Sequence, residues 1–256
     1  MRVARFRVDD AIAFGILDES EGEPAFVELV ADPMFAGYET TGRRFGLGEV
    51  ALLAPVIPRS KVVCIGKNYA AHAEEMGGEA PEAPLLFLKP NTAVIGPGDT
   101  IVIPPQSERV EHEGELVVVI GKMAKNLTAA DAMDVVFGFT AGNDVTARDL
   151  QRADGQWARA KGFDTFCPLG PIIETEFDAS DAAVVTRVNG EVRQQGSTKD
   201  LIHSIADIIA YASSVWTLLP GDVIMTGTPA GVGPLVSGDT VEVQIDGIGT
   251  LRNTVA

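Results

Sequence analysis

The chain has 256 residues, 46% of them hydrophobic and 22% charged, which is typical of a folded protein that buries a sizeable core. Thirty-six Asp and Glu residues against 20 Lys and Arg residues give a formal net charge of −16, which disfavours binding to nucleic acid or to anionic membranes. Apolar runs fall short of the roughly 18 residues of a membrane span, and two distant cysteines predict neither a disulfide framework nor a zinc site, so we expect a cytoplasmic protein.

Residues 1–60 predict a small antiparallel β domain. Short apolar or alternating runs are separated by acidic turns, such as the turn over residues 18–23. The arginines near Met1 are not followed by an apolar run, so we expect no secretory signal. Pro55 and Pro58 precede a buried-strand pattern at 61–66, and we place the boundary with a main domain of residues 61–256 there. The predicted strands of the small domain are 2–8, 12–17 and 25–30.

The main domain is predicted to be rich in strands. Its apolar runs are short and contain many Val and Ile residues, which favour β structure. The pair Asn189-Gly190 is typical of a tight hairpin turn, because both central positions of that turn need a positive φ, and Asp246-Gly247 repeats the pattern. The runs are 61–66, 85–88, 116–120, 135–141, 184–188, 223–226 and 241–245.

Helices are predicted to be fewer. A Thr128-x-x-Asp131 cap opens one of them, and an apolar stripe marks the longest one, over residues 200–218. Strands and helices do not alternate strictly, so we expect a mixed, strand-rich α+β fold and not a doubly wound parallel sheet. The four predicted helices are 68–76, 128–135, 145–161 and 200–218.

Carboxylates are densest just before the apolar run 116–120. In an extended chain Glu111, Glu113 and Glu115 share one face, because side chains alternate with a period of two. Like charges on one face are tolerated on a solvated edge, or where a cation lies between them. For an isolated Glu-x-Glu the solvated acidic edge is the more common case.

Asp144 strengthens the interpretation that a cation lies between the carboxylates. It follows the apolar run 135–141, where it is predicted either to cap the helix 145–161 or to join Glu113 and Glu115. Three carboxylates without a Cys or convincing His ligand form an all-oxygen site, which suits one Mg²⁺ or Mn²⁺ ion and leaves positions for a bidentate oxygen substrate.

Two further motifs carry possible chemistry. His72 and Glu75 are three residues apart on a predicted helix, so the carboxylate can orient the imidazole as a base; the alternative is an ordinary surface helix. The glycines of the segment 226–234 can expose backbone N–H groups to an anion, or can simply form a tight connection. The segment is not a nucleotide-binding loop, because it lacks both phosphate-loop patterns.

Taken together and in order, these motifs resemble the fumarylacetoacetate hydrolase superfamily. The resemblance covers residues 61 to the C-terminus and is weaker for the small N-terminal unit. It implies a catalytic domain with a mixed β-sandwich roll, a homodimer, and a divalent cation, usually Mg²⁺ or Mn²⁺. The motifs are 61–75, 87–90, 111–116, 142–149, 161–164 and 220–233.

The resemblance also implies roles for individual residues. Glu113, Glu115 and Asp144 match the metal ligands, whereas Glu111 matches an acidic position that is not normally a ligand. His72 and Glu75 match a catalytic dyad on a helix that closes over substrate, and Lys161 matches a lysine near the metal. The matches to substrate-binding positions are Lys89, Gly227 and Thr228, the last contacting the substrate's carboxylate end, with Arg148 in a supporting role.

These roles predict a metal-assisted reaction on an anionic 2-oxo acid that carries a second carbonyl or carboxylate group. Hydrolysis of an acylpyruvate-type C–C bond through an enolate is our first expectation. Isomerisation of a 2-hydroxyhepta-2,4-diene-1,7-dioate and decarboxylation of an oxaloacetate-type acid are alternatives, since all three reactions use the same site. A remote alternative is a non-catalytic binding protein that keeps a cation for stability.

Overall fold

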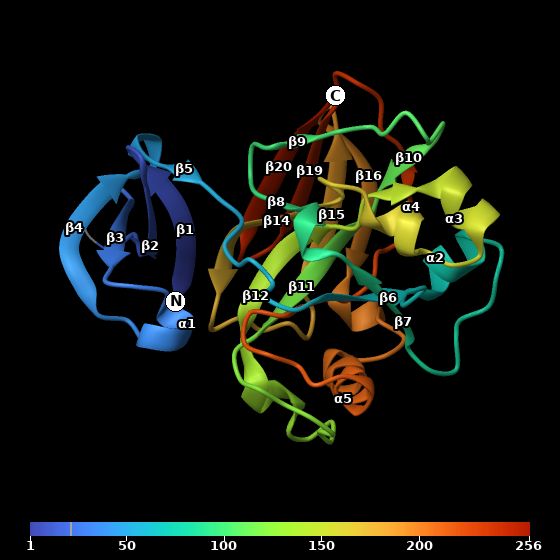
Figure 1. The fold of residues 1–256 in the computed structure, drawn as a ribbon, viewed down its shortest axis with the longest axis horizontal. Coiled ribbons are helices and arrows are strands. Elements are labelled where there is room, and N and C mark those ends of the chain that lie inside the picture. The colour runs from blue at the N-terminus through green and yellow to red at the C-terminus, as the bar shows by residue number, and fades with distance from the viewer. Residues whose placement is uncertain (21) are drawn as a thin grey trace.

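The computed structural model describes residues 1–20 and 22–256 and confirms the strand-rich α+β prediction, with mixed sheets and short helices. The acidic turn predicted over 18–23 includes Glu21, which lies outside the described residues. Figure 1 shows a small lobe of N-terminal strands beside a larger body that contains the rest of the chain. None of the helices in the described part of the chain is long and apolar enough to span a bilayer.

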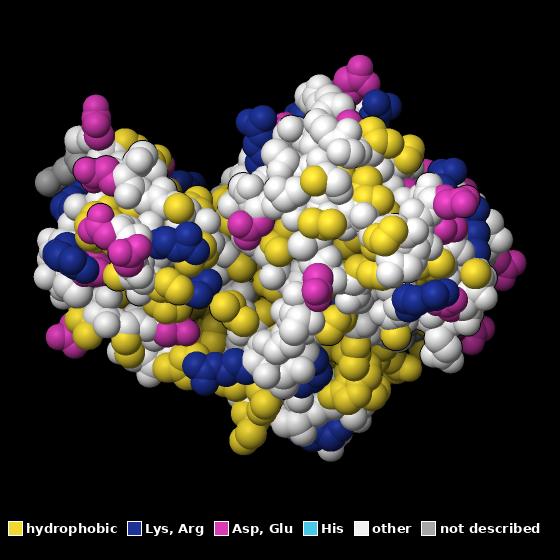
Figure 2. Space-filling model, turned by 45° about the horizontal axis from the view of Figure 1, so that its top comes forward, with side chains coloured by type: hydrophobic (Ala, Val, Ile, Leu, Met, Phe, Trp, Pro, Cys, Tyr) yellow, Lys and Arg dark blue, Asp and Glu magenta, His cyan; other side chains and the backbone are white. Residues whose placement is uncertain are grey.

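The small lobe is an antiparallel unit, as predicted. Its strands follow one another in chain order, and the short strand β5 pairs with β1. The lobe continues the main sheet, because β1 also pairs with β14 of the larger body, at Val3↔Ile173 among other positions. Figure 2 shows a hollow between the two lobes in which hydrophobic side chains are visible. The elements are β1 (Arg2–Val8), β2 (Ala11–Asp18), β3 (Ala25–Leu29), α1 (Pro33–Ala36), β4 (Thr40–Gly46), η1 (Leu47–Glu49) and β5 (Ala51–Leu52).

The large sheet runs in the order β4-β3-β2-β1-β14-β12-β11-β17-β6-β7. It is mixed, since β17 and β6 are parallel whereas β11 is antiparallel to both β12 and β17. β11 is buried on both faces, which explains why its sequence is continuously apolar after Glu115. The new strands are β6 (Val62–Gly66), β7 (Leu85–Lys89), β11 (Gly114–Ile120), β12 (Val136–Asn143), β14 (Cys167–Glu174) and β17 (Val223–Met225).

A second sheet, in the order β16-β15-β19-β20-β9, packs against one face of the large sheet. The main hydrophobic core joins Leu116 and Val118 of β11 to Val184 and Val243 of the second sheet. A small third sheet, β13-β10-β18, borders the site described below. These strands are β9 (Thr100–Ile101), β10 (Val110–His112), β13 (Thr146–Ala147), β15 (Ala183–Val188), β16 (Glu191–Ser197), β18 (Gly233–Pro234), β19 (Thr240–Ile245) and β20 (Gly249–Val255); β8 (Val94–Ile95) pairs with β14.

The range 145–161 is helical in part, but not as the single helix that the sequence predicts. β13 comes first, and two short helices follow, α3 (Arg148–Asp154) and α4 (Ala158–Gly162). Gly155, with a φ of 67°, ends α3 in the left-handed conformation that glycine adopts without steric cost. The N-cap of α3 is Ala147, so the interpretation of Asp144 as a helix cap is also wrong.

The other predicted helices differ mainly in length. α2 (Ala70–Glu75) lies inside the predicted range, and Ser204 caps α5 (Ile205–Val215), which is shorter than predicted. The predicted helix 128–135 is wrong, because only the 3₁₀ turn η3 (Ala132–Val135) forms there. Thr128 Oγ1 does donate to Asp131 Oδ2, but the bond closes a turn before η3. The remaining 3₁₀ turns are η2 (Asn91–Ala93) and η4 (Thr198–Asp200).

Both predicted hairpins exist, with different turns. Asn189 and Gly190 have φ values of 52° and 81°, as the tight turn between β15 and β16 requires. β19 and β20 are joined by three residues, and only Gly247, with a φ of 83°, is left-handed there. Ile248 supplies the extra residue.

Candidate active site

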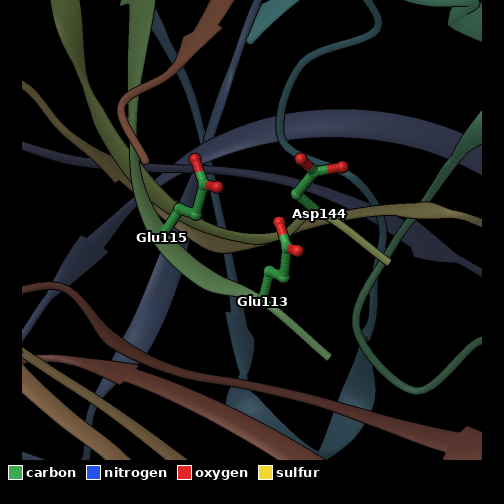
Figure 3. A group of neighbouring side chains, drawn as sticks. All are labelled: Glu113, Glu115 and Asp144. Carbon is green, nitrogen blue, oxygen red and sulfur yellow. The ribbon is translucent and has the colours of Figure 1, made fainter. Parts of the chain in front are cut away.

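Three carboxylates meet where β11 begins and β12 ends. Glu113 and Glu115 flank the first residue of β11, and Asp144 follows β12, the antiparallel partner of β11. Figure 3 shows the three carboxyl groups directed toward one region. Each offers an oxygen within 4.8 Å of the others, and none of the three residues is more than 4% exposed. Burial excludes the solvated acidic edge as the explanation of this cluster.

Two buried lysines approach the cluster. Lys161 Nζ donates to Glu113 Oε2 at 2.7 Å and to Asp144 Oδ2 at 2.6 Å, and Lys89 Nζ donates to Asp144 Oδ1 and to the Val145 carbonyl. Burial disfavours the charge of Lys161, but Asp144 and Glu113 outweigh burial and raise the pKa of its ammonium group. Lys161 therefore stays positively charged at neutral pH.

Arg148 neutralises the side of the cluster that lies away from Asp144. Its guanidinium donates to Glu113, to Glu111 Oε2 at 2.6 Å and to Gln151 Oε1 at 2.6 Å. Burial alone would raise the pKa of Glu113, but the charges of Lys161 and Arg148 hold that pKa far below its usual range. Glu111 also accepts from Arg109 and lies outside the group of three carboxylates.

Glu115 is the carboxylate whose charge lacks compensation. Among the residues that the structure describes, no basic side chain forms a salt bridge with it, and its Oε2 accepts from the backbone N–H of Gly227 at 2.7 Å. Burial, and then the charges of Asp144 and Glu113, raise its pKa well above the ordinary value. A hard divalent cation held by three carboxylate oxygens would relieve this repulsion, so the donor set fits Mg²⁺ or Mn²⁺.

His72 and Glu75 make the predicted contact on α2. Glu75 Oε2 lies 3.1 Å from His72 Nδ1, and the same carboxylate accepts from the backbone N–H of Gly231 at 3.1 Å. This hydrogen bond joins the dyad to the glycine-rich segment 226–234, so the segment holds Glu75 in addition to connecting its neighbouring strands. Glu75 is partly exposed and His72 is buried, so Glu75 lies on the outer side of the dyad.

The three carboxylates and His72 line one cavity of about 190 Å³. Arg148, Lys161 and Thr228 also line it, whereas Lys89 lies behind Asp144 and Gly227 lies beside Glu115, both outside the cavity wall. Sequence reasoning did not single out several other wall residues as functional. They are Ile65, Gly66, Lys67, Met76, Phe87, Gln151, Arg152 and Trp157.

Two signals point toward some of these missed residues. Lys67 directly follows β6 and has a φ of 56°, a conformation that non-glycine residues rarely adopt outside turns and functional segments. Gln151, Arg152 and Trp157 lie in the segment before Lys161, where α3 ends at Gly155, and all three line the cavity. No periodicity in the sequence marks such a break.

Family models match nearly the whole chain. Residues 61–256 match the model described as fumarylacetoacetate (FAA) hydrolase C-terminal, and residues 1–55 match the model described as Rv2993c-like, N-terminal. The chain belongs to the fumarylacetoacetate hydrolase family. The resemblance drawn from the motifs and the β-sandwich fold that it implied are both confirmed.

Similar proteins of this family carry several activities in their names. The crystal structure of 2-hydroxyhepta-2,4-diene-1,7-dioate isomerase from Mycobacterium marinum is 47% identical, with a TM-score of 0.92 and coverage of 100% of this chain and 98% of that chain. Fumarylpyruvate hydrolase from Pseudomonas aeruginosa, solved with Mn²⁺ and pyruvate, is 36% identical, with a TM-score of 0.74 and coverage of 80% and 91%. The human mitochondrial oxaloacetate tautomerase FAHD2A is 46% identical over 81% of this chain and 70% of its own length.

Proposed function

We propose that this family member is a divalent-metal-dependent enzyme that hydrolyses a C–C bond in acylpyruvate-type or fumarylpyruvate-type 2-oxo acids. One observation carries the proposal: the three clustered carboxylates, one of them uncompensated, share a cavity with His72, which Glu75 holds from outside the cavity wall. The fumarylpyruvate hydrolase that resembles this chain was solved with Mn²⁺ and pyruvate, which is a 2-oxo acid.

The cation site and its lysine have separate tasks in this reaction. Glu113, Glu115 and Asp144 would hold one Mg²⁺ or Mn²⁺ ion, which supplies a Lewis acid for the 2-oxo and carboxylate oxygens of the substrate. Lys161 keeps its proton, so it acts as a fixed positive charge beside the enolate that develops when the neighbouring C–C bond breaks. Arg148 holds Glu113 and Glu111 in place.

The His72–Glu75 pair has the geometry of a general base. Glu75 accepts from Gly231 and holds Nδ1 of His72, so Nε2 is left to take a proton from water. In hydrolysis that water attacks the distal carbonyl of the substrate. The proton then passes from His72 to the carbon atom that leaves as the enolate.

Two other reactions of the same enolate are second candidates. Isomerisation or tautomerisation needs a proton moved along the enol system without an attacking water, and decarboxylation needs only the loss of CO₂. The isomerase and tautomerase names of proteins 46–47% identical to this chain favour the first of these. A non-catalytic binding protein is the remote candidate, because the three carboxylates, Lys161 and His72 all line one cavity and Glu75 contacts His72.

A panel of substrates tests the proposal. The purified protein, supplied with Mg²⁺ or Mn²⁺, is incubated with acylpyruvates, a hydroxymuconate-type diene and oxaloacetate, and products are identified by mass. We expect cleavage of an acylpyruvate, with a loss of about 100-fold or more in kcat for His72→Ala and Glu75→Gln. Glu74→Gln, an exposed neighbour on the same helix, is the matched control. If metal binds but no compound turns over, the enzymatic function is refuted.

We also propose that the protein is a cytoplasmic homodimer. β7 is the last strand of the large sheet, and it presents Leu85 and Leu88, 38% and 39% exposed, at an unpaired edge. Exposed leucines on an edge strand, where backbone N–H and C=O groups can pair with another chain, favour association with a second copy. Sedimentation of the wild-type protein and of Leu85→Glu tests the dimer, and a wild-type monomer at micromolar concentration would contradict it.

A further inference from the structure

A second cavity, of about 520 Å³, lies where the small lobe meets the larger body, and it shares no residue with the cavity of the carboxylate cluster. Val3 and Ile173, which are paired across β1 and β14, both line it, so a hydrogen-bonded sheet connects its two sides. The segment 55–59, which leads from one lobe to the other, also lines it. Figure 1 shows α1, another contributor, on the side of the small lobe that faces the larger body.

Most of this wall is apolar. Phe14, Phe35 and Phe137 contribute aromatic rings, and Met34 and Ile57 contribute flexible or branched aliphatic chains. Phe35 and Ile57 are 52% and 51% exposed, which is unusual for large apolar residues that lie together. A concave, mainly apolar wall with a few polar groups is typical of a site for a small molecule.

Two guanidinium groups bring positive charge to this apolar wall. Arg5 is partly buried, and burial lowers the pKa of its guanidinium; its Nη1 donates to the Ala54 carbonyl at 3.3 Å. Arg59 lies over the ring of Phe35, with Cζ 4.4 Å from the ring centroid, which fixes its position. Within residues 1–20 and 22–256 neither arginine forms a salt bridge, although acidic residues outnumber basic ones by 36 to 20 in this chain.

The charges on the wall favour an anion. Asp32 also lines the cavity, and its Oδ1 accepts from Met34 N at 3.0 Å as the cap of α1. Two guanidiniums and this carboxylate leave the wall with a net charge of +1 in a protein whose net charge is −16. A guanidinium in apolar surroundings is unfavourable until an anion pairs with it. The wall therefore fits a ligand that has an apolar body and one anionic group.

We propose that the cavity between the two lobes is a second binding site, for a small apolar carboxylate whose anionic group pairs with Arg5 and Arg59. The hydrocarbon part of this ligand lies against the apolar wall described above. The site goes beyond the proposed function and does not depend on it, because none of its residues is a candidate metal ligand or catalytic residue. A ligand that contacts both lobes also stabilises their packing against each other.

Octanoate and octylammonium form a matched pair of probes, since they have the same hydrocarbon chain and opposite charges. Calorimetry of the 256-residue protein, in Mg²⁺ and again in chelator, measures the affinity of each. We expect octanoate to bind about tenfold more tightly than octylammonium, a difference of ~1.4 kcal/mol, and to bind equally well with and without Mg²⁺. Octanoate binding that vanishes in chelator would belong to the carboxylate cavity and would overturn the proposal.

Charge-removing variants locate the binding site. Arg5→Gln and Arg59→Gln should each weaken octanoate binding about tenfold, because each removes one charge-assisted hydrogen bond. Neither change should weaken octylammonium binding. Arg7→Gln is the matched control, since Arg7 is an exposed residue of the same strand that lies outside the cavity and its loss changes the net charge equally.

A further variant covers the case in which Arg5→Gln does not fold. Phe35→Ala shortens an exposed side chain, so the fold should tolerate it, but it removes part of the apolar wall and the support of Arg59. Octanoate binding should therefore weaken several-fold. No octanoate binding by the wild type, equal binding of the two probes, or equal effects of Arg5→Gln and Arg7→Gln overturns the proposal. If sedimentation shows that Phe35→Ala abolishes self-association, a second copy of the chain fills the cavity, which overturns it as well.

Discussion

Replacing Gly114 by Ala tests whether the close packing around Gly114 fixes the positions of Glu113 and Glu115. A Cβ atom at this position would lie 2.0 Å from Thr186 Oγ1 and 3.2–3.3 Å from both methyl groups of Val243. Ordinary contacts begin near 3.4 Å, so either Thr186 or the backbone of β11 must move by more than an ångström. Because Glu113 and Glu115 flank Gly114, a backbone shift displaces both carboxylates.

The expected loss of stability is about 3 kcal/mol. Overpacking in a dense core costs about 1–3 kcal/mol, and a shift of Gly114 also stretches its bonds to Gln194 and Thr228, each worth about 1 kcal/mol. For a chain of this size a loss of that magnitude lowers Tm by about 6–12 °C. The affinity for Mg²⁺ should fall as well, because the two carboxylates no longer converge.

Thermal denaturation and calorimetric Mg²⁺ titration of Gly114→Ala provide the measurements. Gly48→Ala is the matched control, since a Cβ there meets nothing within 4 Å. Thr186→Ala removes the closest obstacle, so the double variant Gly114→Ala/Thr186→Ala should be more stable than the sum of the two single changes predicts. If Gly114→Ala melts within 2 °C of the wild type and binds Mg²⁺ equally well, the reasoning about this close approach is refuted.

Two further predictions concern buried carboxylates. Burial raises the pKa of Glu115, so the protonated side chain stabilises the metal-free protein fully below the ordinary value of 4.5, and this contribution is lost as the pH rises through the raised pKa, by up to about 1.4 kcal/mol per pH unit. Denaturation in chelator from pH 5 to 9 should therefore show a steeper loss of stability for the wild type than for Glu115→Gln. Parallel curves would contradict this cause. Asp222 is fully buried and accepts hydrogen bonds from Ser60, Lys61 and Leu219 N. Asp222→Ala should therefore lower the free energy of unfolding by about 3–5 kcal/mol, and Asp222→Asn should lower it less. A loss below about 1 kcal/mol in urea denaturation would show that the ion pair with Lys61 does not stabilise the fold.

The strands were predictable because their signals are local. Short runs of Val and Ile between turn residues mark β11 and β15, and Asn189-Gly190 marks a turn whose φ values few other pairs adopt. The failed helix over 145–161 shows the limit of this reasoning. Its first residues pair with β10 instead of entering a helix, and that pairing depends on a strand more than 30 positions away.

The candidate site was predictable where its residues share a short motif. Glu113 and Glu115 are two residues apart, and His72 and Glu75 are three apart, so strand or helix geometry brings each pair together. Asp144 needed the resemblance, because its position after an apolar strand also fitted a helix cap. Gln194 carries no local signal at all. It reaches Gly114 across 80 positions, and only the packing of β16 against the start of β11 makes it a partner of the site.

The charges around the cavity suggest an order of binding. Four buried carboxylates are paired with three buried cations and with the exposed Arg109, which binds Glu111, so no positive charge is left over for an anionic substrate in a chain that is already strongly acidic. The mutual repulsion of Glu115, Glu113 and Asp144 favours a divalent cation. One bound Mg²⁺ or Mn²⁺ ion makes the local charge positive, so the site then attracts a 2-oxo acid despite the net charge of the protein. The cation is therefore expected to bind first, and oxalate should bind measurably only after it. The carboxylates are Glu111, Glu113, Glu115 and Asp144, and the cations are Lys89, Arg148 and Lys161.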